Sequence, residues 1–299
     1  MISNPLQDCL LSAAFIKRLL HDQVHIRRSL WKSLIKRTQL KEEVPLFLDR
    51  EREIIEYFHI PRDKLWAVYL TKGFPNTIRF RRYLDSFFKE ASSSPLLKTA
   101  YAQAAFPYSV RLMLAFEEYS RVTKYLETLL ALHKKGDTSL KTWSVLDYGC
   151  GVSDVGILLS LLGAQVTICD LDDQKLSFAG WRFQRRNLDV KVIAITENTQ
   201  IPDFGKRVYD LIVATEILEH VPNPLRSLRA LTESLKPGGL LFDSLGGRFD
   251  RKSGGDHLAE ALVIGKSQNY QTFYKENYVP VVPVNGISYL FQKRNNSVT

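Results

Sequence analysis

A glycine-rich turn bounded by acidic residues is the part of the sequence that most clearly indicates ligand chemistry. It reads Asp147-Tyr148-Gly149-Cys150-Gly151, and Asp170 follows about twenty residues later. Glycine lets a backbone turn sharply and lie against a ligand, which a Cβ would prevent. A carboxylate at Asp170 can accept both hydroxyls of an adenosine ribose. The spacing therefore predicts a site for a cofactor that contains adenosine.

Two classes of cofactor fit this pattern, a dinucleotide and a methyl donor. Asp147 stands two residues before Gly149, where it would face the cationic amino acid group of S-adenosylmethionine. A dinucleotide site needs a third glycine for close approach of the pyrophosphate, and Ser153 or Asp154 occupies that place. A carboxylate beside a pyrophosphate would also be repelled. We predict a methyl donor, and a dinucleotide-dependent oxidoreductase stays the alternative.

A second group of polar residues follows later in the chain. Glu216, Glu219 and His220 stand at i, i+3 and i+4, so a helix would place them on one face. His257 would join them from the loop after the fifth strand, because such loops converge on the ligand-binding edge of an α/β sheet. We expect His220 or His257 to be the general base. Alternatively, Glu216, Glu219, His220 and His257 bind a divalent metal, or Glu216 and His220 only shape the floor of the pocket.

Alternating short strands and helices must position these residues. The expected strands are 144–147, 165–170, 190–196, 209–214 and 240–244, and the expected helices are 155–162, 173–186 and 224–235. Alternation of buried strands with helices predicts a parallel sheet covered on both faces, a doubly wound, Rossmann-like α/β fold. A final strand pair is expected at 273–282 and 287–291, joined by a turn at 283–286.

The first third of the chain has helical periodicity instead, broken by Pro45, Pro61, Pro75, Pro95 and Pro107. Ser92–Pro95 is the best linker signal, and a long helix is expected at 108–133. We therefore divide the chain into a basic, helical N-terminal region, residues 1–106, and an α/β domain, residues 107–299. The first is expected to cap the substrate side, so deletion of residues 1–100 should spare cofactor binding but abolish turnover.

The charge and the cysteine content of the chain limit which partners it could bind and which cellular compartment it could occupy. The first 136 residues contain 23 Lys and Arg against 14 Asp and Glu, so they carry the whole net charge of +9. This excess indicates either an acidic partner such as RNA or a solvated surface. Basic pairs near Trp31, Phe80 and Tyr83 would suit single-stranded nucleic acid, although such aromatics are more often core. The three cysteines show no CxxC spacing, and no apolar run reaches about 20 residues, so we expect a cytoplasmic protein without a membrane span.

The order of these motifs resembles the class I S-adenosylmethionine-dependent methyltransferases, in particular the branch that contains the ubiquinone-biosynthesis O-methyltransferases. The resemblance covers residues 143–245, through segments 145–153, 167–170, 209–214, 216–221 and 235–239, and Ser153 replaces the usual last glycine of the first. It implies that Asp147, Gly149, Gly151, Asp170 and Glu197 bind the cofactor, with Glu197 near the adenine amino group. The order of Glu216, Glu219, His220 and His257 also resembles metal-dependent methyltransferases that act on small RNAs.

We therefore expect methyl transfer from S-adenosylmethionine to an oxygen or nitrogen of a small-molecule acceptor. Two alternatives stay open beside the oxidoreductase: an RNA methyltransferase that uses the basic N-terminal region, and a non-catalytic scaffold that retains the methyltransferase fold. Salt-sensitive RNA binding would identify the first, and cofactor binding without turnover would identify the second.

Overall fold

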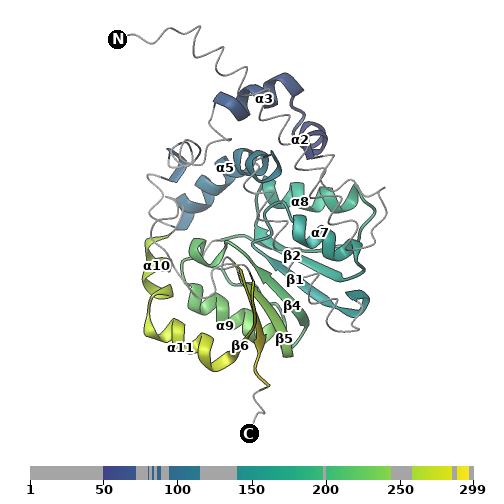
Figure 1. The fold of residues 1–299 in the computed structure, drawn as a ribbon. Coiled ribbons are helices and arrows are strands. Elements are labelled where there is room, and N and C mark those ends of the chain that lie inside the picture. Colours follow the sequence, from purple (N-terminus) through teal and green to yellow (C-terminus); the bar gives the residue numbers. More distant parts are fainter. Residues whose placement is uncertain are drawn as a thin grey trace.

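A mixed sheet forms the centre of the protein (Figure 1). The computed structural model describes residues 50–71, 80, 83, 86–88, 94–114, 140–197, 200–243, 258–284 and 288–295. Within them the strands are β1 (Ser144–Tyr148), β2 (Gln165–Leu171), β3 (Lys191–Ile195), β4 (Tyr209–Ala214), β5 (Leu235–Asp243), β6 (Tyr278–Val284) and β7 (Ser288–Lys293). Their order is β3-β2-β1-β4-β5-β7-β6. Strands β1 to β5 run parallel, and β7 lies antiparallel between β5 and β6.

Helices cover both faces of this sheet (Figure 1). One face packs on α7 (Asp154–Leu161) and α8 (Gln174–Gln184), and the other on α9 (Pro224–Ser234), α10 (Ala259–Gly265) and α11 (Gln268–Asn277). Residues 211–214 of strand β4 are all apolar because both faces are buried: Leu211 and Val213 face the first layer, and Ile212 and Ala214 face the second. The predicted doubly wound, Rossmann-like fold is confirmed.

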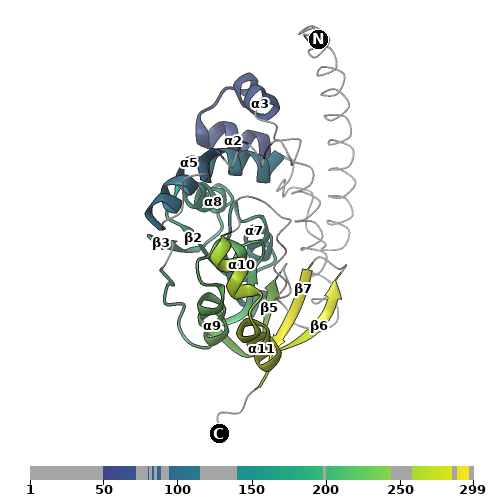
Figure 2. The same ribbon diagram turned by 90° about the vertical axis from the view of Figure 1, so that its left-hand side faces the viewer.

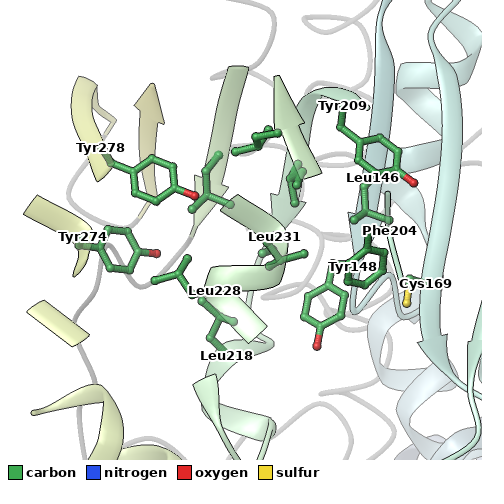
Figure 3. Close-up of a cluster of buried hydrophobic side chains, with 14 of the residues drawn as sticks. Leu146, Tyr148, Cys169, Phe204, Tyr209, Leu218, Leu228, Leu231, Tyr274 and Tyr278 are labelled. Carbon is green, nitrogen blue, oxygen red and sulfur yellow. The ribbon is translucent and has the colours of Figure 1, made fainter. Parts of the chain in front are cut away.

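The second of these cores is rich in aromatic residues, and Figure 3 shows part of it. Leu228 and Leu231 of α9 lie between the tyrosines of the C-terminal segment and the central strands. Tyr148, at the end of β1, packs edge-on against Phe204 with ring centroids 5.8 Å apart. Tyr148 is therefore a core residue, and it fixes the strand end from which the glycine-rich turn begins.

Three N-terminal helices lie on the side of α8 away from the sheet (Figure 2). They are α2 (Arg50–Phe58), α3 (Arg62–Thr71) and α5 (Ser94–Leu114), and two of them, α2 and α5, lie directly against α8. Phe178 of α8 is completely buried among them, which is worth about 1.5–3 kcal/mol for a side chain of this size. This third core joins the helical region to the α/β domain through one shared helix.

The boundaries in this region differ from the prediction. Helix α5 begins at Ser94, inside the predicted linker, and it continues through Pro107 and across the predicted domain boundary at residue 106. Proline tends to break helices, but here tertiary packing outweighs that preference, since Ala104 and Val110 on either side of Pro107 are both completely buried. Residues 115–139, which include most of the predicted helix 108–133, lie outside the described residues.

Local signals placed most element ends correctly. Asp173 caps α8 by accepting hydrogen bonds from the amides of Lys175 and Leu176 at 2.8 and 3.1 Å. Asn223 caps α9 in the same way, and Gly163 has the positive φ expected after a helix. Strand β5 begins five residues earlier than predicted, because Leu235 already pairs with Tyr209 and residues 236–239 form a bulge before Leu240 pairs with Leu211.

The predicted strand 273–282 is wrong in its first half. Residues 268–277 form α11, capped by Ser267, and β6 begins only at Tyr278. Tyr270 and Tyr274 stand one helical turn apart on the buried side of α11, the spacing expected for a helix. The prediction of a strand followed instead the preference of aromatic side chains for β-structure. The antiparallel pairing of the last two strands is confirmed. None of the described helices has both the length and the apolar character that crossing a membrane requires.

Candidate active site

The candidate site lies where the direction of winding of the sheet reverses. The chain proceeds from β1 outward to β2 and β3, and then returns to place β4 on the other side of β1. The loops after β1 and β4 therefore leave the sheet at neighbouring strand ends, which is where open α/β sheets bind ligands. The two loops are in contact, because a Cβ added to Gly149 would lie 2.6 Å from Cβ of Ile217. This contact brings the two predicted groups of site residues together.

We call residues Gly149–Ser153 the cofactor loop. Gly149 and Gly151 have φ of 70° and 56°, the left-handed region that favours glycine. The Gly149 amide donates to the Cys169 carbonyl at 2.8 Å, and the Gly151 amide donates to Oδ2 of Asp170 at 2.8 Å. The loop is thus bonded to the end of β2, and it presents backbone without side chains at two positions.

Asp147 is buried beneath this loop at the end of β1. Its Oδ2 accepts a hydrogen bond from the Ser153 hydroxyl at 2.7 Å. Burial raises the pKa of Asp147 from 3.8 to about 7, the hydrogen bond from Ser153 lowers it, and the nearby charge of Asp170 raises it further. A carboxylate with this pKa is poised to receive a cationic group, whose approach would favour its ionised form.

Asp170 occupies the end of β2, as predicted. Its Oδ1 accepts from the Leu171 amide at 2.8 Å and lies 3.2 Å from Nζ of Lys175, while its Oδ2 accepts from Gly151. Burial alone would lower the pKa of Lys175, but Asp170 and Asp173 raise it above its usual range, so the lysine stays charged. An ionised carboxylate offers about four acceptor positions, and these three contacts leave room for a hydroxyl at Oδ2.

Ser153 and Asp154, which stand where a dinucleotide site would have glycine, have structural roles. Ser153 adopts φ 53°, and its hydroxyl bonds Asp147 instead of capping α7. Asp154 begins α7 and turns away from the cofactor loop. Its Oδ1 lies 2.9 Å from the Arg182 guanidinium, and its Oδ2 pairs with Arg50. These contacts explain the unusual residues at both positions.

The segment after β4 is not the helix that was predicted. Only Leu218–His220 form a 3₁₀ turn, and Glu216 precedes it with φ 53°. The left-handed residue and the tighter 3₁₀ geometry remove the i, i+3, i+4 face on which Glu216, Glu219 and His220 were expected to meet. Instead, His220 faces the N-terminal region, where its Nδ1 lies 3.4 Å from the hydroxyl of Tyr101 in α5.

Glu219 is buried beside His220. It is 1% exposed, and its Oε1 lies 4.0 Å from Nε2 of His220. Burial raises the pKa of Glu219 to about 7, the proximity of His220 lowers it, and Glu216 and Asp243 raise it. Asp243, also buried, accepts a hydrogen bond of 2.5 Å from Tyr274. Glu219 and Asp243 are therefore two buried acids close enough for the charge of Asp243 to raise the pKa of Glu219.

The predicted metal site has no support from the described residues. Nowhere among them do three histidine, cysteine or carboxylate side chains gather closely enough to hold a metal ion. His257, the predicted fourth ligand and alternative base, lies outside the described residues. Glu216, Glu219 and His220 by themselves do not converge, so we derive no step through a metal.

Two further predicted features can be located. Glu197 follows β3 at the same edge of the sheet as the cofactor loop and is exposed, so its place near an adenine stays a prediction. Phe80, proposed as a stacking platform for RNA, is 2% exposed and packs edge-on against Tyr108, with the guanidinium of Arg111 over its ring at 4.7 Å. It is a core residue and cannot stack a base. The other basic and aromatic residues of that prediction, apart from Tyr83, lie outside the described residues.

Known proteins resemble this chain over the same region. Residues 113–265 match a family described as a methyltransferase domain. A ubiquinone biosynthesis O-methyltransferase of Shewanella pealeana is 32% identical over 126 residues, 40% of this chain and 53% of the relative. Its counterpart from Xanthomonas campestris is 33% identical over 137 residues, 44% of this chain and 56% of the relative. The chain thus spans about half the length of these curated relatives.

Two solved structures are also similar. The PH0226 protein from Pyrococcus horikoshii OT3 is 18% identical and aligns with 60% of this chain and 92% of its own, with a TM-score of 0.43. A SAM-dependent methyltransferase from Aquifex aeolicus is 19% identical and aligns with 55% of this chain and 86% of its own, with a TM-score of 0.40.

Proposed function

Since the methyltransferase family model covers 153 of its 299 residues, the chain belongs to that family, and we propose that it transfers a methyl group from S-adenosylmethionine to a small-molecule acceptor. The observation that carries the proposal is the cofactor loop, where two left-handed glycines separate the buried carboxylates of Asp147 and Asp170. The ribose hydroxyls and the amino group of S-adenosylmethionine need polar partners, which the two carboxylates can supply. The two glycines let the backbone approach the ligand closely.

The residues of the loop fit this cofactor. Asp170 would accept a ribose hydroxyl at Oδ2, and Asp147 would face the amino group of the methionine moiety. Gly149 and Gly151 would let the backbone lie against the ligand, because neither presents a Cβ. When bound, S-adenosylmethionine supplies an activated methyl group on a sulfonium, so the protein has mainly to hold the acceptor in line and to manage its proton.

His220 is our candidate for the group that takes this proton. If its Nδ1 carries the hydrogen and donates it to the hydroxyl of Tyr101, Nε2 keeps a lone pair and can act as the base. Glu219 lies 4.0 Å from Nε2, and above its raised pKa of about 7 its carboxylate would stabilise the imidazolium that results. Tyr101 comes from α5, so the N-terminal region would contribute directly to the reaction centre.

The relatives point to the type of acceptor. They are O-methyltransferases that carry a small-molecule pathway in their names, so we propose an oxygen of a small molecule, with a nitrogen as the alternative. The burial of Phe80 removes one of the aromatic platforms that an RNA-binding function would have used. A catalytically silent scaffold would bind the cofactor in the same way, so turnover is the observation that separates it from an enzyme.

The test is calorimetric binding of S-adenosylhomocysteine. The wild-type protein is expected to bind it, and Asp170→Ala should weaken binding by about tenfold or more, because each lost charge-assisted bond costs about 1.5–3 kcal/mol. The matched control is Asp172→Ala, which removes an exposed carboxylate two residues away and should change nothing. A wild-type protein that binds neither S-adenosylmethionine nor S-adenosylhomocysteine would overturn the proposal.

A further inference from the structure

A buried network of charged side chains connects the N-terminal helix α2 to the cofactor loop. Its members are Arg50 and Glu53 of α2, Asp154 at the start of α7, Arg182 of α8, and Arg186, which follows α8 and pairs with Oε1 of Glu53. The side chains of Arg50, Glu53 and Arg182 are completely buried, and that of Asp154 is 3% exposed. Charged groups are very rarely buried this completely unless they are paired, so the network imposes a specific arrangement on the elements that carry it.

Arg182 is the centre of this network, and its guanidinium bonds three elements. Nε donates to Oε2 of Glu53 at 2.9 Å, and Nη2 donates to Oδ1 of Asp154 at 2.9 Å. Nη1 donates to the carbonyl oxygen of Val152, which belongs to the cofactor loop. One planar group therefore fixes α2, the loop backbone and the first residue of α7 together, a geometry that a lysine could not reproduce.

Arg50 completes the attachment from the N-terminal side. It pairs with Oδ2 of Asp154, and its Nη1 donates to the carbonyl oxygens of Leu112 and Met113 at 3.1 and 3.2 Å. Asp154 thus has one arginine on each carboxylate oxygen. It stands directly after Ser153, whose hydroxyl bonds Asp147, so the charged network and the candidate cofactor site are adjacent along the chain.

We propose that Glu53 and Arg50 are positioning residues for the cofactor: through Arg182 and Asp154 they fix residues 152–154 in the conformation that receives S-adenosylmethionine. The N-terminal helix is then part of the cofactor site rather than a separable cap. The expectation from sequence was that deletion of residues 1–100 spares cofactor binding, and the network leads us to expect the opposite. This inference rests on the proposed use of the loop as the cofactor site.

The chain offers a matched pair of variants on one helix. Glu53→Gln keeps the size of the side chain but removes the charge that holds Arg182. Glu56→Gln, one turn further along α2, removes an exposed contact of 2.9 Å with Arg185, the residue that ends α8, which connects the same two helices without reaching the loop. Loss of helix docking alone would affect both variants, whereas loss of loop positioning would affect only the first.

Two measurements on the full-length chain decide the matter. The first is the dissociation constant of S-adenosylhomocysteine, measured below the melting temperature of each variant. The second is hydrogen exchange of the backbone amides at 149–153 without cofactor. Glu53→Gln should weaken binding by about tenfold and speed exchange of these amides, because a charge-assisted bond to their support is lost. Glu56→Gln should change binding by less than about twofold, as expected for an exposed ion pair.

Arg50→Lys serves as the milder variant if Glu53→Gln does not fold. It keeps a positive charge near Asp154 but cannot also bond both carbonyl oxygens of α5, so we expect about threefold weaker binding and faster loop exchange. The inference is overturned if the folded variants bind S-adenosylhomocysteine and exchange their loop amides like the wild type, or if Glu56→Gln has the same effect as Glu53→Gln. Failure of the wild type to bind would instead overturn the proposed function. The exchange data would still test whether the buried network holds the loop in place.

Discussion

Cofactor binding should depend on pH through Asp147. Because burial raises its pKa to about 7, this carboxyl group is largely protonated at pH 6 before any ligand arrives. An amino group of the cofactor placed beside it would require the ionised form, so binding must displace the proton. Below the pKa the displaced proton costs affinity, and above it binding occurs without that cost.

The size of the effect follows from the same pKa. At pH 6 about nine in ten molecules carry the proton on Asp147, against about one in four at pH 7.5, so the affinity for S-adenosylhomocysteine should rise about eightfold between the two. A higher pH is best avoided, because the amino group of the ligand begins to lose its own proton. Calorimetry gives a second readout: the apparent enthalpy at pH 6 should change with the ionisation enthalpy of the buffer, because about one proton is released for each ligand bound.

Two variants sharpen this prediction. Asp147→Asn cannot ionise, so its weaker binding should lose both the pH dependence and the buffer dependence. Ser153→Ala removes the hydrogen bond that lowers the pKa of Asp147, so the rise in affinity should move to higher pH. If the wild type shows equal affinity at pH 6 and 7.5 and no effect of buffer, Asp147 does not face a cationic group of the ligand and its assignment is wrong.

Three further predictions concern other parts of the site. The raised pKa of Glu219 means that the folded wild type holds a proton that the unfolded chain loses, so its free energy of unfolding should fall by about 3 kcal/mol as pH rises from 4.5 to about 7. Glu219→Gln should abolish this part of the pH dependence in urea unfolding, whereas the exposed Glu260→Gln should leave it unchanged. Gly149→Ala should cost about 2–4 kcal/mol because its Cβ would meet Ile217 at positive φ, whereas Gly180→Ala has open space in a helix and should not destabilise. Tyr101→Phe keeps the ring contact with Phe88 but loses the hydroxyl near His220, so turnover should fall about two- to tenfold with a shifted pH profile and unchanged S-adenosylhomocysteine binding. Unchanged turnover in Tyr101→Phe, unchanged stability in Gly149→Ala, or an unchanged pH dependence of stability in Glu219→Gln would contradict the respective contact.

The features that sequence predicted well are those set by neighbours along the chain. The strands from β1 to β4 are short, mainly apolar runs between turn signals. Asp147 and Asp170 lie within β1 and β2, and the cofactor loop directly follows β1. Their mutual contact, such as that of Gly151 with Asp170 at 2.8 Å, follows once β1 and β2 are parallel neighbours. For these residues the fold leaves little freedom, so local pattern is enough.

The features that sequence missed depend on conformation at single residues or on distant partners. Glu216 adopts φ 53°, a state that no local signal indicated, and together with the 3₁₀ turn at 218–220 it breaks the helical face proposed for Glu216, Glu219 and His220. Arg182 and Glu53 are separated by 129 positions, so spacing rules cannot relate them. Asp154 was noticed only as a residue unsuited to a pyrophosphate, although its burial between two arginines is the reason for its presence.

The buried network also has a consequence for how the chain folds during synthesis. Helix α2 leaves the ribosome long before Arg182 does, and at about 5–20 residues per second the 129 intervening positions take about 6–26 s to translate. Throughout that interval Glu53 lacks the arginine that compensates its burial, so α2 cannot reach its final place. The N-terminal helix must therefore wait in a hydrated or chaperone-bound state until α8 has been made, and slow translation of this stretch would prolong its exposure to proteases.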